Sequence, residues 1–289
     1  MTTTSKSEPF KAEHSASEPG WGSSYRLIAS EKWKAKSAAM GKAVTEALVE
    51  YAAPKPGMHV LDLASGTGEP AISIAMRVGA QGRVTALDLS ADLLEIAKER
   101  AQERGLDNFL TQQADAHALP FDDNSFDLAT SRFGVMFFRD PGLASQELHR
   151  VLKAGARACF LAWGPVEQPY WQSTMGVVHR HVGGPLLSPG GPDPFRFAQP
   201  GNLSAMLQSA GFRAVHEETK TVPWTWPGTP EEVWEQARAV SVPFRPMLDR
   251  VPAGLWPQIH EEVHAAIGQY VRGESIEFGA SVVLASGSK

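Results

Sequence analysis

Apolar runs typical of buried strands alternate with helical patterns between residues 58 and 163. Strands that alternate with helices pair in parallel, because each helix carries the chain back to the other end of the sheet. The pattern predicts an α/β fold: a doubly wound, mostly parallel sheet with helices on both faces. The expected strands are "MHVLDL", "RVTALDL", "NFLTQQ", "FDLATS" and "ARACFLAW", and the expected helices lie near residues 70–79, 91–105 and 143–152.

The segments on either side of this core have different sequence patterns. A helical pattern runs from about Glu31 to Ala52, and "RAVHEETKTV" and "IEFGASVVLAS" predict two more strands after residue 211. Between these two strands, "TPEEVWEQ" has the form of a capping box that begins at Thr229. We expect a mobile tail at 1–20, an N-terminal helical lid segment at 21–57, a cofactor-binding core at 58–163, an insertion or cap at 164–200, a continuation of the core at 201–221, a helical cap at 222–274, and the last core strand and tail at 275–289.

The first expected strand breaks into a glycine turn, "VLDLASGTGEP", at residues 60–70. Gly66, Gly68 and Ala71 fit G-x-G-x-x-[G/A], and Asp88, twenty residues after Gly68, could accept hydrogen bonds from ribose hydroxyls. Ligands of open α/β sheets collect at the carboxyl ends of the strands, where glycines let a ligand approach the backbone. The turn alone is compatible with a dinucleotide, with another nucleotide-like cofactor, or with a purely steric bend.

Charge and cysteine content narrow the possible partners. The net charge is −5 and the 27 Lys and Arg residues are scattered, so we do not expect binding to nucleic acid. Cys159, the single cysteine, lies in "ACFLAW" and is expected to be a buried structural thiol.

The sequence shows neither the apolar stretch of a signal peptide nor a membrane-spanning run, so we expect a cytoplasmic protein without a membrane span. A homodimer is compatible with the sequence.

Further motifs follow the glycine turn in a fixed order. Asp62 stands in "LDLASGTG", Asp115 stands in "QQADAHALPF", and "FDLATSRFGVMFF" and "RVLKAGARACFLAW" come next. Over about residues 40–163 the chain resembles the class I S-adenosylmethionine-dependent methyltransferases, most closely the ubiquinone and menaquinone biosynthesis C-methyltransferases. The resemblance implies a seven-stranded Rossmann-like sheet whose last strand is antiparallel and lies beside the fifth.

The resemblance also implies where S-adenosylmethionine, and S-adenosylhomocysteine as product, would bind. The glycine turn would approach the methionine part of the cofactor, Asp88 would hold both ribose hydroxyls, and Asp115 would accept from the adenine amino group. Arg132 and Phe133 would line the methionine end. The residues assigned to the cofactor in this way are Asp62, Ala64, Ser65, Gly66, Gly68, Asp88, Leu89, Asp115, Ala116, Arg132 and Phe133.

Three positions depart from the family pattern. Ala64 stands where the family often has a glycine, and Ala154 and Ala156 replace the proline and second glycine of "LKPGG". Ala64 has a small side chain, so we expect the cofactor loop to be preserved.

Methyl transfer from a sulfonium mainly requires alignment and exclusion of water, so no catalytic side chain is obligatory. A general base is needed only for a hydroxyl or an acidic carbon. No metal is expected: "IHEEVHAAIGQY" contains H-E-x-x-H but lacks a third ligand, and Ile259, Val263, Ile267 and Tyr270 predict an amphipathic lid helix instead. Candidate bases are Tyr170, His179, His181, His260 and His264.

The tryptophans predict an apolar or aromatic acceptor. Of the eight, none falls between residues 58 and 162, and five lie in the insertions, where they either line a pocket over the methyl group or attach the cap. The expected reaction is methylation of O, N or C of a small molecule. The expected pocket residues are Phe133, Met136, Phe137, Trp163 and Trp171.

Two other interpretations remain open at this point. The glycine turn and Asp88 also suit an NAD(P)-dependent oxidoreductase, although Asp115 and the strand pattern after residue 211 fit it less well. A non-catalytic member of the fold that binds the cofactor is the second alternative. A segment around Trp21 to Trp33 is expected to close over the bound cofactor.

Overall fold

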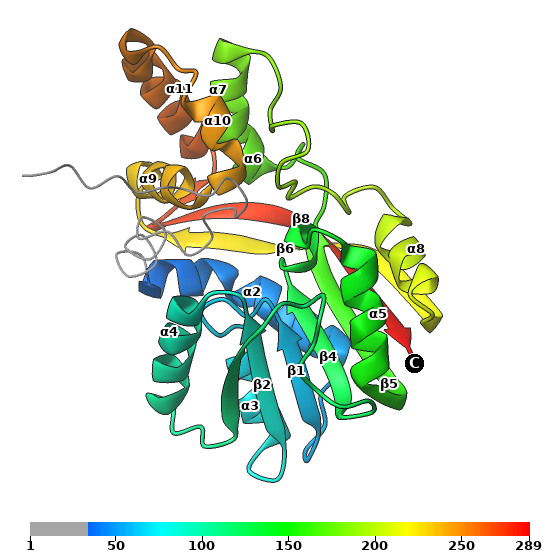
Figure 1. Ribbon diagram of the computed structural model, residues 1–289. Coiled ribbons are helices and arrows are strands. Elements are labelled where there is room, and N and C mark those ends of the chain that lie inside the picture. The colour runs from blue at the N-terminus through cyan, green and yellow to red at the C-terminus, as the bar shows by residue number, and fades with distance from the viewer. Residues whose placement is uncertain (1–33) are drawn as a thin grey trace, which may run out of the picture.

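The computed structural model describes residues 34–289, which form one mixed sheet with helices on both faces and a helical cap (Figure 1). The strand order is β3-β2-β1-β4-β5-β8-β6, and a short β7 pairs with β8. The first five strands are parallel, whereas β8 is antiparallel to both β5 and β6. The strands are β1 (His59–Leu63), β2 (Arg83–Asp88), β3 (Phe109–Gln113), β4 (Phe126–Arg132), β5 (Leu152–Trp163), β6 (Arg213–Pro227), β7 (Val271–Arg272) and β8 (Ser275–Ser288).

This topology confirms the predicted doubly wound sheet, including the antiparallel strand beside the fifth. The seven-stranded path is complete, and β7 is an addition that the sequence did not predict. The expected tail at 1–20 and the proposed lid around Trp21 to Trp33 lie outside the described residues.

The helices form two layers around the sheet (Figure 1). Helix α3 contacts both α2 and α4 on one side, and α5 and α8 pack together on the other. The remaining helices belong to the cap. The α-helices are α2 (Lys34–Ala52), α3 (Ala71–Val78), α4 (Ala91–Gln102), α5 (Pro141–Val151), α6 (Pro169–Ser173), α7 (Met175–Val182), α8 (Asn202–Ser209), α9 (Pro230–Val240), α10 (Arg245–Leu248) and α11 (Trp256–Gly268), with 3₁₀ turns η1 (Val135–Phe137), η2 (Val242–Phe244) and η3 (Ala253–Leu255).

The central strands are buried on both faces, which explains their nearly continuous apolar sequences. Cys159 of β5 has no exposed surface, and burial raises the pKa of its thiol to about 12. The residue therefore packs as a small apolar side chain, as predicted from its sequence context.

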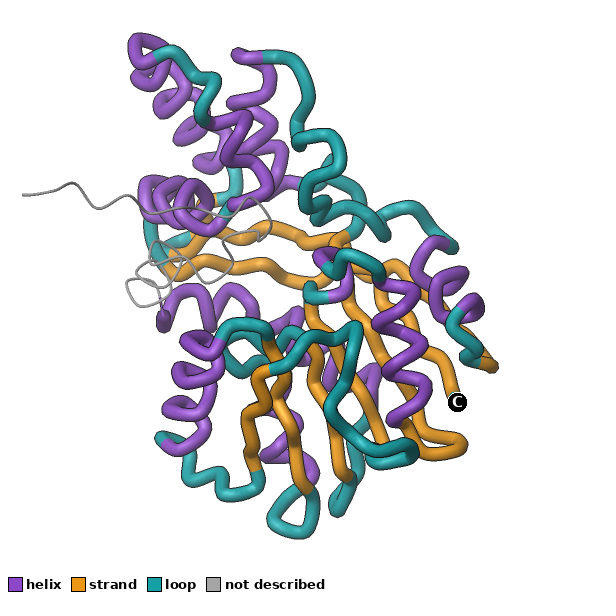
Figure 2. Tube along the Cα trace, viewed as in Figure 1, coloured by secondary structure: helices purple, strands orange, loops and turns teal. Residues whose placement is uncertain are grey.

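The cap lies beyond the carboxyl ends of the parallel strands (Figure 1). It is carried by β6 and β8, which run on together past the other strands and form a long two-stranded ladder, visible as two extended strands in Figure 2. β6 crosses the expected boundary at residue 221 without a break and ends at Pro227. Consequently the cap is joined to the core through continuous strands.

Two predicted features of the cap helices are confirmed. At the start of α9, Thr229 Oγ1 accepts from the Glu232 N–H (3.3 Å), and Glu232 Oε2 accepts from the Thr229 N–H (3.1 Å), which completes the capping box. In α11, Ile259, Val263 and Ile267 are fully buried, so the helix is amphipathic as expected.

Candidate active site

The glycine bend connects β1 to α3, and its two glycines are required for different reasons. Gly66 has φ +53°, and a Cβ there would meet no atom of residues 34–289 within 4 Å. Gly68 has φ +108°, and a Cβ there would lie 2.6 Å from Ile72 Cδ1 and 3.2 Å from Ala97 Cβ. Gly68 thus permits close packing of α3 and α4, whereas Gly66 leaves open space above the backbone.

Asp88 ties the end of β2 to this bend. Its Oδ2 accepts from the Gly66 N–H (2.9 Å), and its Oδ1 accepts from the Ser90 N–H (2.9 Å). The next residue, Leu89, leaves 65% of its surface exposed, although it is a large apolar side chain. The tip of β2 therefore presents a carboxylate and an apolar surface side by side.

Asp115 lies just beyond the end of β3, the strand next to β2. Asp88 pairs with Gln113 in this sheet, so Asp115 is two residues past the position opposite Asp88. Its side chain is 46% exposed, and its Oδ1 accepts from the His117 N–H (2.9 Å) and contacts His117 Nδ1. Partial burial raises the pKa of Asp115, but the hydrogen bonds from His117 outweigh it and hold the pKa below its ordinary value. The neighbouring Ala116 is buried.

Asp62, at the end of β1, is completely buried beneath the bend. Thr130 Oγ1 donates to its Oδ1 (2.6 Å), and Ser65 Oγ donates to its Oδ2. Burial raises the pKa of Asp62 to about 7, and the two hydrogen bonds and the charge of Arg132 oppose this rise. The carboxyl therefore titrates near neutral pH.

Arg132 connects the end of β4 to α2. Its Nη1 donates to Thr45 Oγ1 (2.8 Å) and to the Gly41 carbonyl (3.4 Å). Its Nε is buried and has no acceptor within residues 34–289. Burial lowers the pKa of Arg132, while the charges of Glu69 and Asp62 raise it. One buried N–H of the guanidinium thus has no partner in the part of the chain that the structure describes.

Two residues near this point adopt the left-handed backbone that favours glycine. Ala64 has φ +53° and Phe133 has φ +63°. They follow β1 and β4, where a Cβ on Gly134 would lie 2.5 Å from the Ala64 Cβ. Each such conformation costs about 1 kcal/mol or more, and such strain concentrates at functional sites. Ala64 thus adopts a backbone conformation that glycine, the residue the family often has there, would adopt without this strain.

An aromatic cluster continues from Phe133 toward the cap. The Phe133 ring stacks on Trp163 at 4.3 Å, and Trp163 meets the edges of Trp171 at 5.6 Å and Trp224 at 5.1 Å. The indole N–H groups of Trp171 and Trp224 are buried and have no acceptor in the described part of the chain. These rings form an apolar path from the strand ends into the cap.

The other two expected pocket residues lie on η1. Met136 is buried, and its Sδ accepts from the Trp163 N–H (3.3 Å), so it packs directly behind the cluster. Phe137 is partly buried against the core.

The candidate bases lie in cap helices and have partners there. Tyr170 OH donates to Gln236 Oε1 (3.3 Å), burial raises its pKa, and its ring contacts Trp171 and Trp224. The histidines link helices or loops of the cap instead. His181 Nε2 pairs with Glu262 (2.9 Å), His264 Nε2 pairs with Glu231 (3.0 Å), His260 Nε2 lies 3.3 Å from Arg238 Nη1, and His179 Nε2 lies 2.8 Å from the Gly184 carbonyl oxygen.

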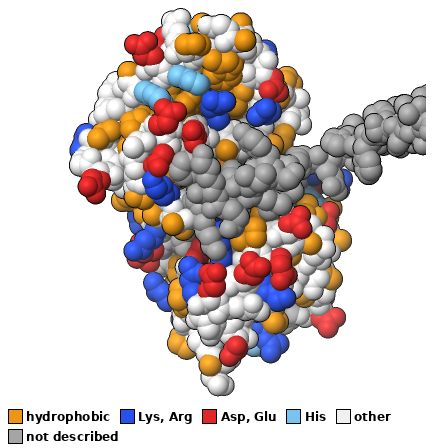
Figure 3. All heavy atoms as spheres, turned by 90° about the vertical axis from the view of Figure 1, so that its left-hand side faces the viewer, with side chains coloured by type: hydrophobic (Ala, Val, Ile, Leu, Met, Phe, Trp, Pro, Cys, Tyr) orange, Lys and Arg blue, Asp and Glu red, His pale blue; other side chains and the backbone are white. Residues whose placement is uncertain are grey.

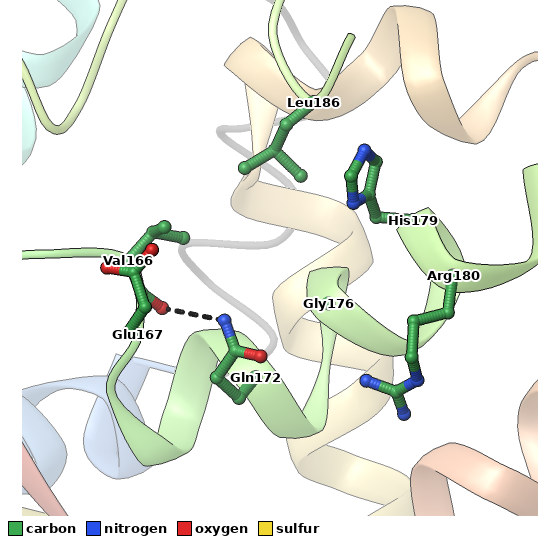
Figure 4. Close-up of a pocket in the computed structure, with 7 residues that line it drawn as sticks. All are labelled: Val166, Glu167, Gln172, Gly176, His179, Arg180 and Leu186. Carbon is green, nitrogen blue, oxygen red and sulfur yellow. Dashed lines mark hydrogen bonds between the residues drawn. The ribbon is translucent and has the colours of Figure 1, made fainter. Parts of the chain in front are cut away.

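His179 also lines a pocket within the cap (Figure 4). His179 and Arg180 project from α7, and Gln172 of α6 donates to the Val166 carbonyl (3.2 Å) on the opposite side. The lining residues are Val166, Glu167, Gln172, Gly176, His179, Arg180 and Leu186.

The H-E-x-x-H histidines do not gather metal ligands. His260 faces a guanidinium, and His264 is paired with Glu231. Throughout residues 34–289 there is no group of three or more His, Cys, Asp or Glu side chains placed to hold a metal ion.

Sequence reasoning missed three residues that shape the site. Thr130 bonds Asp62, Gly134 lets the β4 turn approach Ala64, and Thr45 bonds Arg132. A signal existed for Thr130, because two hydroxyl residues, Thr130 and Ser131, follow the apolar pair Leu128 and Ala129 in the buried part of β4.

The fold and this arrangement of strand tips define a Rossmann-like methyltransferase domain. A family model described as the ubiE/COQ5 methyltransferase family matches residues 37–183, and the chain belongs to this family. It is therefore a methyltransferase.

Relatives from several bacteria carry quinone-related names. The chain is 35% identical over 195 residues to a ubiquinone/menaquinone biosynthesis C-methyltransferase UbiE of Brucella abortus, covering 62% of this chain and 71% of that protein. It is 46% identical over 117 residues to a 2-phytyl-1,4-naphtoquinone methyltransferase of Nostoc punctiforme, covering 40% of this chain and 51% of that protein. The second match thus spans about half of the relative.

Solved structures share the fold. The YcgJ protein of Bacillus subtilis has a TM-score of 0.56 at 22% identity, covering 85% of this chain and 97% of that one. A putative methyltransferase of Bacillus halodurans has a TM-score of 0.54 at 21% identity, covering 85% and 98%. None of the helices described for this chain is both long and apolar enough to cross a membrane.

Proposed function

We propose that this methyltransferase binds S-adenosylmethionine at the glycine bend and transfers its methyl group to a small aromatic acceptor of the quinone type. The observation that carries the proposal is the pair of carboxylates at neighbouring strand tips. Asp88 is bonded to the bend itself, and Asp115 stands on the adjacent strand end. Acceptors at two adjacent strand ends suit a nucleoside, whose ribose and base offer donors at its two ends.

The residues of the bend fit the other parts of this cofactor. The open space at Gly66 leaves room for a ligand against the backbone. Leu89 offers an exposed apolar surface for a planar base. The Arg132 Nε–H, which has no acceptor within residues 34–289, suits a carboxylate, and the buried Asp62 suits a nearby positive charge. These features support the assignment of Ala64, Ser65, Gly68, Ala116 and Phe133 to the same site.

The acceptor side is proposed to be the aromatic cluster around Trp163. It begins at Phe133, where the strand ends meet, and leads into the cap. Aromatic side chains favour a flat apolar ring. The indole N–H groups of Trp171 and Trp224, which have no acceptor among the described residues, suit its oxygen atoms. The names of the relatives, a UbiE and a phytylnaphthoquinone methyltransferase, support an acceptor of this kind.

The proposed methyl transfer requires little chemical participation from the side chains. S-adenosylmethionine, when bound, supplies a methyl group already activated by the positive charge of sulfur. The bend and the strand-tip carboxylates hold the adenosyl part in a fixed position, and the aromatic cluster orients the acceptor and excludes water. Tyr170 is the one candidate base whose ring contacts this cluster, whereas the candidate histidines are paired within the cap.

Other properties are proposed on more general grounds. Acidic and basic side chains are interspersed on the face shown in Figure 3, which suits a protein that acts on small molecules in the cytoplasm rather than on nucleic acid. A homodimer remains a proposal that sedimentation analysis would test.

The test combines binding and turnover. Calorimetry should show saturable binding of S-adenosylmethionine and S-adenosylhomocysteine, and Asp88→Ala should abolish it. Labelled methyl groups should then appear on a reduced naphthoquinone with an isoprenoid side chain. Binding without turnover on any quinol would favour a non-catalytic cofactor-binding member, and binding of NADH in place of both ligands would favour an oxidoreductase.

A further inference from the structure

His117 holds a position between two loops at the edge of the proposed adenine site. Its side chain is only 11% exposed, and both ring nitrogens have partners. Nδ1 contacts Asp115 Oδ1, and Nε2 accepts from the backbone N–H of Asp140 at 3.0 Å. The edge of the Phe138 ring lies against the imidazole, with centroids 6.1 Å apart. The ring is therefore fixed from three directions.

These contacts determine which nitrogen carries the proton. A backbone N–H can only donate, so Nε2 must offer its lone pair to Asp140. The proton then resides on Nδ1 and is donated to Asp115 Oδ1. Asp140 is itself held in place, because its side chain caps α5 by accepting from the Leu143 N–H at 2.9 Å. The start of α5 thus sets the orientation of the imidazole.

The same contacts leave one oxygen of Asp115 for a ligand. Oδ1 receives both the backbone N–H and the ring N–H of His117. Within the described residues, no group donates a hydrogen bond to Oδ2. A carboxylate on an exposed loop would otherwise rotate and offer either oxygen.

We propose that His117 is a positioning residue that locks Asp115 so that Oδ2 selects a 6-amino purine over a 6-keto purine. This inference rests on the proposed binding of an adenosyl cofactor. A 6-amino group donates to Oδ2, whereas a 6-keto oxygen would face it as a second acceptor. A carboxylate that His117 holds in place cannot rotate away from the keto oxygen. The unfavourable contact between the two acceptors therefore keeps its full cost in binding free energy.

Two variants test the two hydrogen bonds of the His117 imidazole one at a time. The amide nitrogen of His117→Asn occupies the place of Nδ1 and keeps the donor to Asp115. The amide of His117→Gln reaches the place of Nε2 and keeps the acceptor for Asp140, but loses the donor to Asp115. Both replace the imidazole by an amide, so each controls for the general loss of the ring.

The experiment is calorimetric titration with S-adenosylhomocysteine and with its inosyl analogue, in which a keto oxygen replaces the 6-amino group. The native protein should prefer the adenosyl ligand by about tenfold or more. His117→Asn should keep most of this preference, and His117→Gln should reduce it to about twofold or less. Thermal melts establish that both variants are folded.

The outcomes distinguish the two proposals. Unchanged selectivity in His117→Gln, or equal binding of both ligands by the native protein, would overturn the role of His117 while leaving the cofactor assignment intact. Failure of the native protein to bind S-adenosylhomocysteine at all would overturn the proposed function and this inference with it. If His117→Gln does not fold, Asp115→Asn serves instead: its amide can donate to the keto oxygen, so retained tenfold selectivity there would contradict the inference.

Discussion

Asp62 shows how a single buried side chain can make the site sensitive to pH. Burial raises its pKa from an ordinary value of 3.8 to about 7, despite hydrogen bonds from Ser65 and Thr130. The folded state therefore binds this proton more tightly than the unfolded chain. The resulting contribution to stability is complete below about pH 4 and is lost as the pH rises through about 7.

A cationic ligand should reverse this preference, because a positive charge favours the ionised carboxylate. We predict that the affinity for S-adenosylmethionine rises about tenfold between about pH 6 and pH 8, with release of a proton at the lower pH. Titration calorimetry in buffers of different ionisation enthalpy measures both quantities. In Asp62→Asn this side chain no longer titrates, so any remaining pH dependence of the affinity comes from ionisation of the ligand itself. An equal pH dependence in this variant would exclude Asp62 as the source.

Single residues of the proposed site could be predicted when the signal lay nearby in the sequence, and were missed when it depended on contacts with distant residues. Asp62, Asp88 and Asp115 were identified because they stand beside recognisable strand ends. Thr130 was missed because its bond to Asp62 spans 68 residues and depends on the pairing of β1 with β4. The contact between Ala64 and Gly134 was missed for the same reason.

Among the elements, the glycine bend offers a matched pair of substitutions. Gly68→Ala would place a Cβ 2.6 Å from Ile72 Cδ1 at φ +108°, so we expect a loss of about 2 kcal/mol in unfolding free energy. The Cβ of Gly66→Ala meets no atom of the described residues within 4 Å, so the variant should cost about 1 kcal/mol through its unfavourable φ of +53°. Urea denaturation measures both losses.

The same two variants should differ in binding. Gly66→Ala fills the open space above the bend, so it should weaken the affinity for S-adenosylhomocysteine while the protein stays folded. A variant as stable as predicted that binds as tightly as the native protein would show that no ligand occupies this space.

Helix α9 links the cap to α2 through Glu232. Its Oε2 accepts from the Thr229 N–H, from Trp226 Nε1 at 3.4 Å and from Lys36 Nζ at 2.5 Å, and the bond from Lys36 is the main reason that its pKa is lowered. Thr229→Ala should cost about 1 kcal/mol of unfolding free energy through loss of the cap. Glu232→Gln keeps an acceptor for the cap and should cost about 1 kcal/mol or less through loss of the ion pair.

Chemical denaturation checks these two losses. The control is Lys42→Ala, which removes the exposed Lys42–Glu46 pair of α2 and should leave stability nearly unchanged. A Thr229→Ala variant as stable as the control would contradict the role of the capping box.

Elements were predicted best where one physical signal dominated. The buried parallel strands were located by their apolar runs, and α9 by its capping box. β6 was predicted too short, because its outer part contains Pro and Trp and leaves the main sheet, whereas both ends of β8 were predicted to within two residues. Their pairing, such as Trp226 with Ile276, joins residues 50 positions apart.

At the scale of the whole molecule, the sheet brings the proposed cofactor and acceptor sites together. The strand tips carry Asp88 and Asp115, and the rings of Phe133 and Trp163 lead from the same edge of the sheet into the cap. The alternation of strands and helices predicted the parallel sheet, and the family resemblance implied its antiparallel strand. Neither could predict how the cap packs, since that depends on contacts among aromatic rings from separate segments.

The central claim is that the glycine bend and the two strand-tip carboxylates hold one adenosyl group. A crystal structure with S-adenosylhomocysteine tests it most directly. The account predicts ribose hydroxyls bonded to Asp88, the adenine amino group bonded to Asp115 Oδ2, and the sulfur at the Phe133 end of the aromatic cluster. A nucleoside bound elsewhere, or one that touches only one of these carboxylates, would contradict it.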